Sequence, residues 1–342
     1  MPETINNTVW QIYCIGFIGL LGLIIGSFLN VVALSLLAGE SMKRPRSMCP
    51  KCNAKIAWYD NLPVLSYILL KAKCRHCKCN ISFQYPLVEV STCLMFVFLF
   101  LSFGLTLKLF FLMFLAAGLI VISITDLKEQ LIYDVVSMPI IPIGLVYSFF
   151  DIGNTGMGSI GGIPLIGSVH LSFVYGVLGA IAGVAVFEGL ARLGKVIVGE
   201  RAFGEGDSVL AAGLGAWFGI ENLLLIVLLS FIIQVLIGIP IIVINMYKDK
   251  DYKSIGFTSL MLFSLCIPYL SKVSHFSESM PGALITMISS LTLAVVGSIA
   301  IIQSAKKRES FTFIPFGPAL VFGAVIVLFF GNTIIQSYTS LF

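Results

Sequence analysis

Charged residues are scarce in this sequence of 342 residues. They make up 11% of it, against about 25% in an average soluble domain. Hydrophobic residues make up 58%, and the mean hydropathy is +1.01. This balance excludes a soluble globular protein and predicts a polytopic membrane protein, whose folding is constrained by lipid. The net charge of +4 is too small to indicate a nucleic-acid partner.

The amino-terminal stretch MPETINNTVW lacks features of a secretory signal peptide. It has no basic region, and no small-residue cleavage site follows a short apolar stretch. We therefore expect the first apolar run to be retained as a transmembrane helix. The sequence also has no obvious internal repeat.

Long apolar runs, by contrast, fill most of the chain. A helix needs about 20 apolar residues to cross the hydrocarbon core of a bilayer. The candidate runs are 10–37, 87–103, 107–125, 133–150, 170–191, 207–219, 221–246, 256–271, 282–303 and 316–336. The predicted fold class is an all-α polytopic membrane protein with about ten transmembrane helices. The run 207–219 is short, so it can cross only if its polar start is buried in protein or faces water.

Lysine and arginine are distributed unevenly between the loops. With the N-terminus outside, 19 of the 21 fall in the inner loops, and Lys108 and Lys272 remain outside. The positive-inside rule favours this orientation strongly over the reverse. It places the loop 39–86 in the cytoplasm and the loop 151–168 outside. The cytoplasmic loop is the one sizeable water-exposed domain that the runs leave.

Four cysteines in this loop form two pairs, CPKC at 49–52 and CRHC at 74–77. Two CxxC pairs at this separation are typical of a four-cysteine zinc site. Thiols stay reduced on the cytoplasmic side, which makes a disulfide pair the weaker interpretation. Four thiolates leave no open coordination position, so the predicted zinc is structural. Its ligands are Cys49, Cys52, Cys74 and Cys77, with Cys79 and His76 as alternative donors.

Two aspartates lie at similar depth near the inner face. Asp126 ends one apolar run in ITDLKEQ, and Asp207 begins another in FGEGDSVL. A carboxylate in a membrane is costly away from the ends of a span. Either aspartate alone is explained as a helix cap. Capping does not explain Gly204 and Gly206, which allow a close approach of backbone or substrate.

Brought together, two aspartates have a chemical use. Because like charges a few ångströms apart cannot both ionise easily, the pair shares one proton. The ionised member then activates water, and the protonated member donates to a scissile carbonyl. The pattern predicts aspartic-protease chemistry at Asp126 and Asp207. Asp134 is a third candidate, although the start of the next crossing is its favoured role.

Several segments together resemble the bacterial type IV prepilin peptidases, also called leader peptidases/N-methyltransferases, which are GxGD intramembrane aspartyl proteases. The similar segments are GSFLNVV (26–32), the four-cysteine stretch 47–89, TDLKEQLIYD (125–134), FGEGDSVLAAGLGAWFG (203–219) and IPFGPAL (314–320). GEGD alone is weak evidence. In this order, together with the cysteine stretch, the set is specific.

The resemblance implies catalytic roles for Asp126 and Asp207 in a bacterial cytoplasmic (inner) membrane. It also implies prepilin or pseudopilin substrates with a short basic leader that is cleaved after a glycine at the cytoplasmic face. S-adenosylmethionine is implied as methyl donor to the new N-terminus. This sequence departs from the family at three positions: Val209 stands where the family often has Lys, Tyr133 where it usually has Pro, and Ser35 near a position where it usually has Arg. Both aspartates are present despite these departures.

The expected organisation has five parts. They are a first transmembrane helix (1–38), the four-cysteine loop (39–86), catalytic helices (87–246), an extra segment with two helices (247–313) and a final helix (314–342). Eight helices are thus family-like and two are extra, and membrane lipid surrounds them all. Two other functions remain open from the residues: a proton-coupled transporter that uses both carboxylates, and a secretion-system scaffold without catalysis.

Overall fold

The structure is a computed structural model that describes residues 2–39, 48–49, 51–150, 168–198, 201, 203–248, 256 and 315–339. The chain divides into two compact units, Met1–Phe231 with Pro315–Phe342, and Ile232–Ile314. The first unit contains both aspartates and the cysteine loop. The predicted runs 256–271 and 282–303 lie outside the described residues, except for Gly256.

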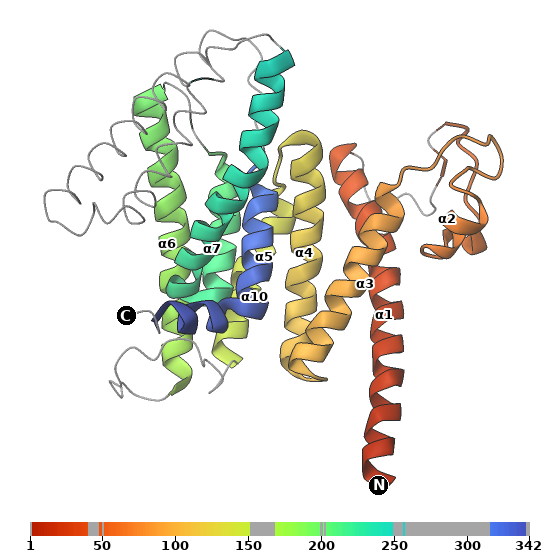
Figure 1. Cartoon of the computed structure of the whole chain (residues 1–342), viewed down its shortest axis with the longest axis horizontal. Helices are drawn as coiled ribbons and strands as arrows, with labels where there is room; N and C mark the ends of the chain where they lie inside the picture. Colours follow the sequence, from red (N-terminus) through yellow and green to blue (C-terminus); the bar gives the residue numbers. More distant parts are fainter. Residues whose placement is uncertain are drawn as a thin grey trace, which may run out of the picture. The chain divides into compact units, whose positions relative to one another are not determined.

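Regular secondary structure in the described ranges is helical, apart from two isolated β-bridges (Figure 1). The elements are α1 (Pro2–Leu37), η1 (Trp58–Asn61), α2 (Leu65–Leu69), α3 (Gln84–Phe103), α4 (Leu107–Glu129), α5 (Asp134–Phe150), α6 (Ser168–Val198), α7 (Glu205–Lys248) and α10 (Gly317–Thr339). By length and composition, five candidate spans are present: Val9–Leu37, Gln84–Phe103, Leu107–Glu129, Ser172–Val196 and Glu205–Gly238. Two shorter apolar helices are Asp134–Phe149 and Gly317–Gly331. The predicted all-helical, multi-pass membrane protein is confirmed, and ten crossings stay a prediction.

Helix α7 is a hairpin of two helices. Gly219 interrupts it with φ 74° and ψ 172°, a conformation that is open to glycine because it has no Cβ. The ring of Phe203, before the helix, lies 6.1 Å from the ring of Phe231. A straight helix would separate these residues by about 42 Å. The chain therefore reverses near Gly219, which agrees with the two separate runs expected at 207–219 and 221–246.

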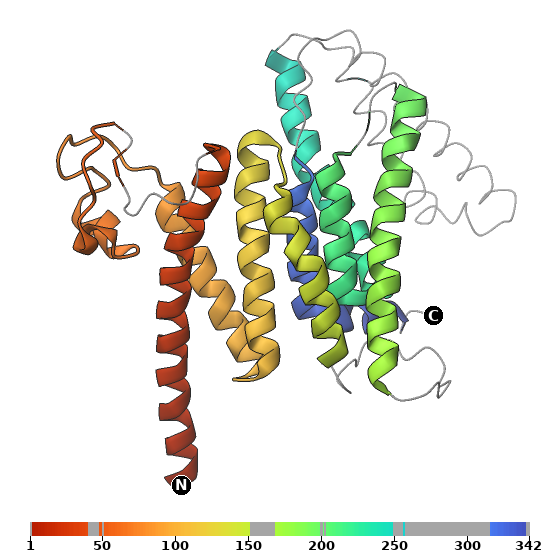
Figure 2. The same ribbon diagram turned by 180° about the vertical axis from the view of Figure 1, so that it is seen from behind.

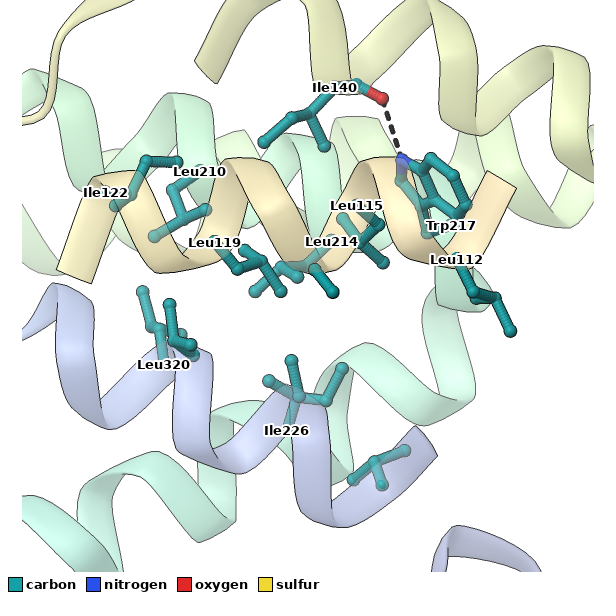
Figure 3. Close-up of a cluster of buried hydrophobic side chains, with 14 of the residues drawn as sticks. Leu112, Leu115, Leu119, Ile122, Ile140, Leu210, Leu214, Trp217, Ile226 and Leu320 are labelled. Atoms are coloured by element: carbon teal, nitrogen blue, oxygen red, sulfur yellow. Dashed lines mark hydrogen bonds between the residues drawn. The ribbon is translucent and has the colours of Figure 1, made fainter. Parts of the chain in front are cut away.

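Helix α4 is central to the first unit, because it packs against α1, α3, α5 and α10 (Figures 1 and 2). One face of α4 carries a row of leucine and isoleucine side chains that points into the core beside α7 and α10 (Figure 3). This row contains Leu112, Leu115, Leu119 and Ile122. Trp217 of α7 closes one end of the cluster by donating a 2.8 Å hydrogen bond to the Ile140 carbonyl of α5.

Small residues allow α1 and α3 to approach closely. A Cβ at Gly22 would lie 2.7 Å from the Cα of Cys93, and one at Gly26 would lie 2.8 Å from the Cα of Glu89. This is the small-xxx-small packing of membrane helices. Asn30, one turn further along α1, is fully buried and donates to the Tyr85 carbonyl at 3.2 Å. The GSFLN segment therefore fixes α1 to the start of α3.

Candidate active site and metal centre

Asp126 lies in the last turn of α4 and is 4% exposed. Its Oδ2 accepts a 2.9 Å hydrogen bond from the backbone N–H of Gly317, the first residue of α10. Free N–H groups and the dipole at a helix start favour negative charge at this place. A Cβ at position 317 would lie 2.5 Å from the same oxygen. Glycine at position 317 thus permits α10 to meet the carboxylate.

Asp207 is the third residue of α7 and is half-buried. Its Oδ2 accepts a 3.1 Å hydrogen bond from the backbone N–H of Gly204, immediately before the helix. An acidic residue in the third helical position makes this contact when it reaches back to the N-cap backbone. The capping role considered from the sequence is therefore present, and it occupies one oxygen of the carboxylate.

The segments that carry the two aspartates meet at Gly206. A Cβ at this position would lie 2.7 Å from the Cβ of Ile132, in the connection that follows α4. Gly206 directly precedes Asp207, and Ile132 lies six residues after Asp126. The structure thus brings together the two segments that carry the aspartates.

An aromatic cluster joins the start of α7 to the start of α10. The ring of Phe316 lies 5.1 Å from Phe203, 5.2 Å from Phe231 and 5.8 Å from Phe187. Aromatic pairs of this kind contribute about 0.5–1.5 kcal/mol beyond the burial of their area. Because Phe316 directly precedes Gly317, the cluster also fixes the N–H group that contacts Asp126.

The neighbouring acidic residues have other roles. Arg201 donates to Glu205 and to Glu188, each at 2.7 Å, and Arg192 donates to Glu188 at 3.0 Å. Glu188 and Arg192, four residues apart, thus form an ion pair on one face of α6. Asp134 is exposed as the first residue of α5, in keeping with its favoured role as a helix start. Asp126 and Asp207, by contrast, accept the hydrogen bonds described above from backbone N–H groups and not from basic side chains.

The cysteine loop contains two turns of the same backbone geometry, 49–54 and 74–79. In each turn the carbonyl of the first cysteine accepts from the N–H four residues later, at 2.8 Å for Asn53 and 3.1 Å for Lys78. Both of these residues are left-handed, with φ of 55° and 59°. A short β-bridge closes each turn. The repeated geometry presents the four thiols to one another.

The sulfur atoms of Cys49, Cys52, Cys74 and Cys77 all lie within 4.8 Å of one another. The Sγ atoms of Cys49 and Cys77 are 3.8 Å apart. Sulfurs at about 2.3 Å from a tetrahedral zinc are separated by about 3.8 Å, so the spacing fits this metal. The predicted four-cysteine cluster is confirmed as a group that could hold a metal ion.

Cys79 is the fifth thiol of the loop, and its Sγ lies 3.7 Å from that of Cys49. It occupies the position that Ala54 has in the first turn: the carbonyl of Ala54 accepts from Cys49, and that of Cys79 accepts from Cys74. The turn geometry therefore needs no thiol at position 79. The alternative ligand considered from the sequence is within reach, but it stands outside the repeated pattern.

The thiols of Cys49 and Cys79 also differ in pKa. Hydrogen bonds from the backbone N–H groups of Cys52 and Lys51 lower the pKa of Cys49 to about 6. The hydrogen bond with the Cys77 side chain, together with burial, raises the pKa of Cys79 to about 12. Burial and hydrogen bonds with the Cys49 and Cys77 side chains also raise the pKa of Cys52, to about 11, so these pKa values do not rank Cys79 against the four proposed ligands.

Two parts of the chain match models of known protein families. Residues 20–103 match the bacterial peptidase A24 N-terminal domain, and residues 113–239 match the type IV leader peptidase family. The first range includes the four cysteines, and the second includes Asp126 and Asp207.

Curated relatives cover most of the same length. A prepilin leader peptidase/N-methyltransferase of Neisseria gonorrhoeae is 31% identical over 264 residues, which are 70% of this chain and 85% of the relative. The chain belongs to the type IV leader peptidase family. Other members of the family under the same name are that of Pseudomonas aeruginosa, 32% identical over 64% of this chain and 78% of the relative, and that of Myxococcus xanthus, 34% identical over 65% of this chain. The matched part spans 62% of the Myxococcus xanthus relative. No solved structure matches the chain.

Gly317 and Ile132 contact the segments that carry the two aspartates, and the sequence does not predict either contact. The segment IPFGPAL was noted as similar to the family, but no contact was expected between its glycine and Asp126. Both residues are apolar and leave no chemical signal in the sequence. The contacts arise from the close approach of the Gly317 backbone to the Asp126 carboxylate and of the Ile132 side chain to Gly206.

Proposed function

We propose that the protein is a prepilin leader peptidase in which Asp126 and Asp207 form the catalytic pair. The substrates are prepilin or pseudopilin proteins, whose short basic leader is cleaved at the cytoplasmic face of the bacterial inner membrane. Family membership and the names of the curated relatives support this activity. One observation supports the residue assignment: the N–H that begins α10 contacts Asp126, and Gly206, next to Asp207, packs against Ile132, six residues after Asp126. Both aspartates lie in the segment that matches the family.

In the proposed mechanism the two carboxylates share one proton. The ionised aspartate takes a proton from water as the water oxygen attacks the scissile carbonyl, and the protonated aspartate donates to the carbonyl oxygen. A proton then passes to the leaving nitrogen, and the pair returns to its starting state. The Gly317 N–H stabilises the ionised form of Asp126 from one side.

The decisive experiment uses a prepilin-like peptide and purified protein in detergent. We expect Asp126→Asn and Asp207→Asn each to abolish cleavage, because either change removes one proton carrier and keeps the side-chain shape. The double variant should be no worse than either single variant, since the pair acts as a unit. Zinc content and thermal unfolding serve as controls for folding. Near wild-type cleavage by a folded Asp207→Asn protein would contradict the proposal and favour capping or transport.

A structural zinc ion is the proposed occupant of the four-cysteine cluster. Cys49, Cys52, Cys74 and Cys77 would hold it, and the 3.8 Å sulfur spacing supports this metal. The ion would supply folding free energy to a loop that has little secondary structure of its own. No chemistry at the peptide bond is assigned to it.

Methylation of the new N-terminus is the second proposed activity. The curated relatives are named N-methyltransferases as well as leader peptidases, which supports S-adenosylmethionine as the methyl donor. Incubation of cleaved substrate with isotopically labelled donor tests this activity separately from cleavage. Label in the amino-terminal residue is the expected result, and cleaved but unlabelled product would contradict it.

The proposed topology has ten crossings with the N-terminus outside and the cysteine loop in the cytoplasm. The uneven distribution of 19 and 2 basic residues supports it. We expect an impermeant thiol reagent to label Asn154→Cys in intact cells and to leave the loop cysteines unlabelled until lysis. Labelling of Asn154→Cys after lysis alone would reverse the orientation.

A further inference from the structure

Apolar side chains are exposed on the small helices of the cysteine loop. Leu65, Ile68 and Leu69 of α2 are 57%, 64% and 75% exposed, and they share one helix face because they are three and four residues apart. Trp58 of η1, which packs against α2, is 80% exposed. Phe83, just before α3, is also exposed. Together these five residues make up what we term the loop surface.

The loop surface is held at the level of a transmembrane helix end. Val64, immediately before α2, donates its backbone N–H to Oε2 of Glu89 at 2.7 Å. Glu89 is 5% exposed and lies about 7.5 Å along α3 from its first residue, Gln84. Because Gln84–Phe103 is a candidate span, this bond places α2 beside the end of the span. Figures 1 and 2 show α2 next to the adjoining ends of α1 and α3, not beyond them.

The same loop is rich in basic residues. Residues 39–86 contain nine Lys or Arg and two acidic residues, Glu40 and Asp60. Lys71, Lys73 and Lys78 follow α2 and are all exposed. Asp60 already pairs with Arg75, at 2.6 Å. The part of the loop that the structure describes therefore combines an apolar face with excess positive charge.

We propose that the loop surface is a membrane-docking site that inserts into the interface of an anionic bilayer. Tryptophan with aliphatic side chains next to lysines is the composition of helices that lie in a membrane interface. The lysines would bind acidic lipid headgroups, while Trp58 and the α2 face enter the acyl-chain boundary. The hydrogen bond from Val64 to Glu89 would set how deeply the loop surface lies in the membrane interface. Docking concerns the position of the loop, so it stands whether or not Asp126 and Asp207 are catalytic.

Two features favour lipid over a protein partner as the occupant. The loop is attached at both ends to membrane helices, α1 and α3, which keeps it at the bilayer surface. Its exposed apolar residues follow Val64, which is hydrogen-bonded to α3 near the start of that candidate span. Docking on the bilayer therefore requires no component beyond the membrane that the span itself crosses.

Fluorescence of Trp58 in full-length protein in lipid nanodiscs tests the proposal. The emission of Trp58 is obtained by subtracting the signal of Trp58→Phe from that of the wild type, because Trp10 and Trp217 are common to both. We expect lipid brominated near the ester end of its acyl chains to quench most of this emission in discs of phosphatidylglycerol and phosphatidylcholine. Lipid brominated near the methyl end should quench it less. The emission of Trp10, obtained in the same way by subtracting the signal of Trp10→Phe, shows how strongly each brominated lipid quenches a tryptophan at the end of a spanning helix.

Two variants separate the apolar and electrostatic contributions. Leu65→Ser/Ile68→Ser/Leu69→Ser should lose most of the quenching of Trp58 in any lipid. Lys71→Gln/Lys73→Gln/Lys78→Gln should lose the additional quenching that phosphatidylglycerol gives over phosphatidylcholine. Unchanged zinc content shows that each variant is folded.

Three results would overturn the proposal. The first is Trp58 emission that aqueous acrylamide quenches and brominated lipid does not. The second is equal quenching with and without phosphatidylglycerol, which removes the electrostatic part. The third is protection of Trp58 that appears upon addition of a prepilin-like peptide and not before, which would assign the loop surface to the substrate.

Discussion

The aspartate site and the cysteine loop position their reactive groups in opposite ways. Asp126 is 4% exposed and is held by the backbone of a helix 191 residues further along the chain. The four cysteines lie in two short turns with hydrogen bonds between near neighbours. Helix packing therefore makes the first site, and local turn geometry makes the second.

This difference predicts different sensitivities to change. The aspartate site should respond to any added volume where helix backbones touch, because packed helices cannot yield separately. The cysteine loop should tolerate added volume and respond to the loss of a cysteine ligand, since the proposed zinc would supply its folding free energy. The following predictions test this contrast in order of expected effect on cleavage.

Gly317→Ala should have the largest effect. The new methyl group would lie 2.5 Å from Oδ2 of Asp126, so α10 or the carboxylate has to move. Misplacement of a catalytic group by about 1 Å costs roughly a hundredfold in rate. We expect a loss of this size in kcat, measured with the prepilin-like peptide, and unchanged zinc content.

Gly189→Ala is the matched control, because nothing lies within 4 Å of a Cβ at this position of α6. It should cleave normally and be slightly more stable, since alanine is favoured over glycine in a helix by about 1 kcal/mol. Equal activity of Gly317→Ala and Gly189→Ala would show that the contact between α10 and Asp126 is unimportant.

The two glycines of GEGD should differ in their response to alanine. A Cβ at Gly206 would lie 2.7 Å from Ile132, whereas one at Gly204 would have its nearest neighbour at 3.5 Å. We expect Gly206→Ala to lower kcat/KM about tenfold, which corresponds to ~1.4 kcal/mol in the transition state. Gly204→Ala should remain close to wild type. The opposite order would indicate that substrate approach, and not packing on Ile132, requires glycine here.

Loss of a cysteine ligand should affect the loop more than the reaction. We expect Cys52→Ser to lose bound zinc and to become sensitive to protease at residues 51–83, with a smaller loss of cleavage than Gly317→Ala. Cys79→Ser should retain one zinc per chain, because Cys79 lies outside the repeated turn pattern. Elemental analysis and limited proteolysis are the measurements. Zinc lost from Cys79→Ser and retained by Cys52→Ser would assign the fourth ligand to Cys79.

Asp60→Asn should have the smallest effect. Hydrogen bonds from Arg75, at 2.6 and 2.8 Å, lower the pKa of Asp60 below its ordinary value of about 3.9. A lowered folded-state pKa stabilises the loop above the unfolded pKa, and the stabilisation is lost as the pH falls through the folded pKa. Hydrogen exchange in the loop should thus be faster in Asp60→Asn than in wild type at neutral pH. The two proteins should become alike in strong acid, and a difference that persists there would exclude this ion pair as its cause.

Much of this architecture could be predicted because its signals are local. Apolar runs of sufficient length indicated α1, α3 and α4, and a glycine-rich short run indicated the first half of the α7 hairpin. Apolar runs define helix ends less closely: the run 107–125 belongs to a helix that continues to Glu129, so Asp126 lies in its last turn. Lipid sets the length of an apolar run but not the residue at which the helix ends.

The sequence by itself determined the membrane class, the two aspartates and the four cysteines, because each depends on composition or on spacing within a short segment. The tertiary structure decided which groups surround Asp126. It also decided which other distant segments touch. The Gly317 N–H contacts Asp126, the Ile132 side chain packs against Gly206, and Val64 donates its N–H to Glu89. Such contacts depend on how closely two helix backbones approach, and that distance is set by packing in three dimensions and not by any periodicity along the chain.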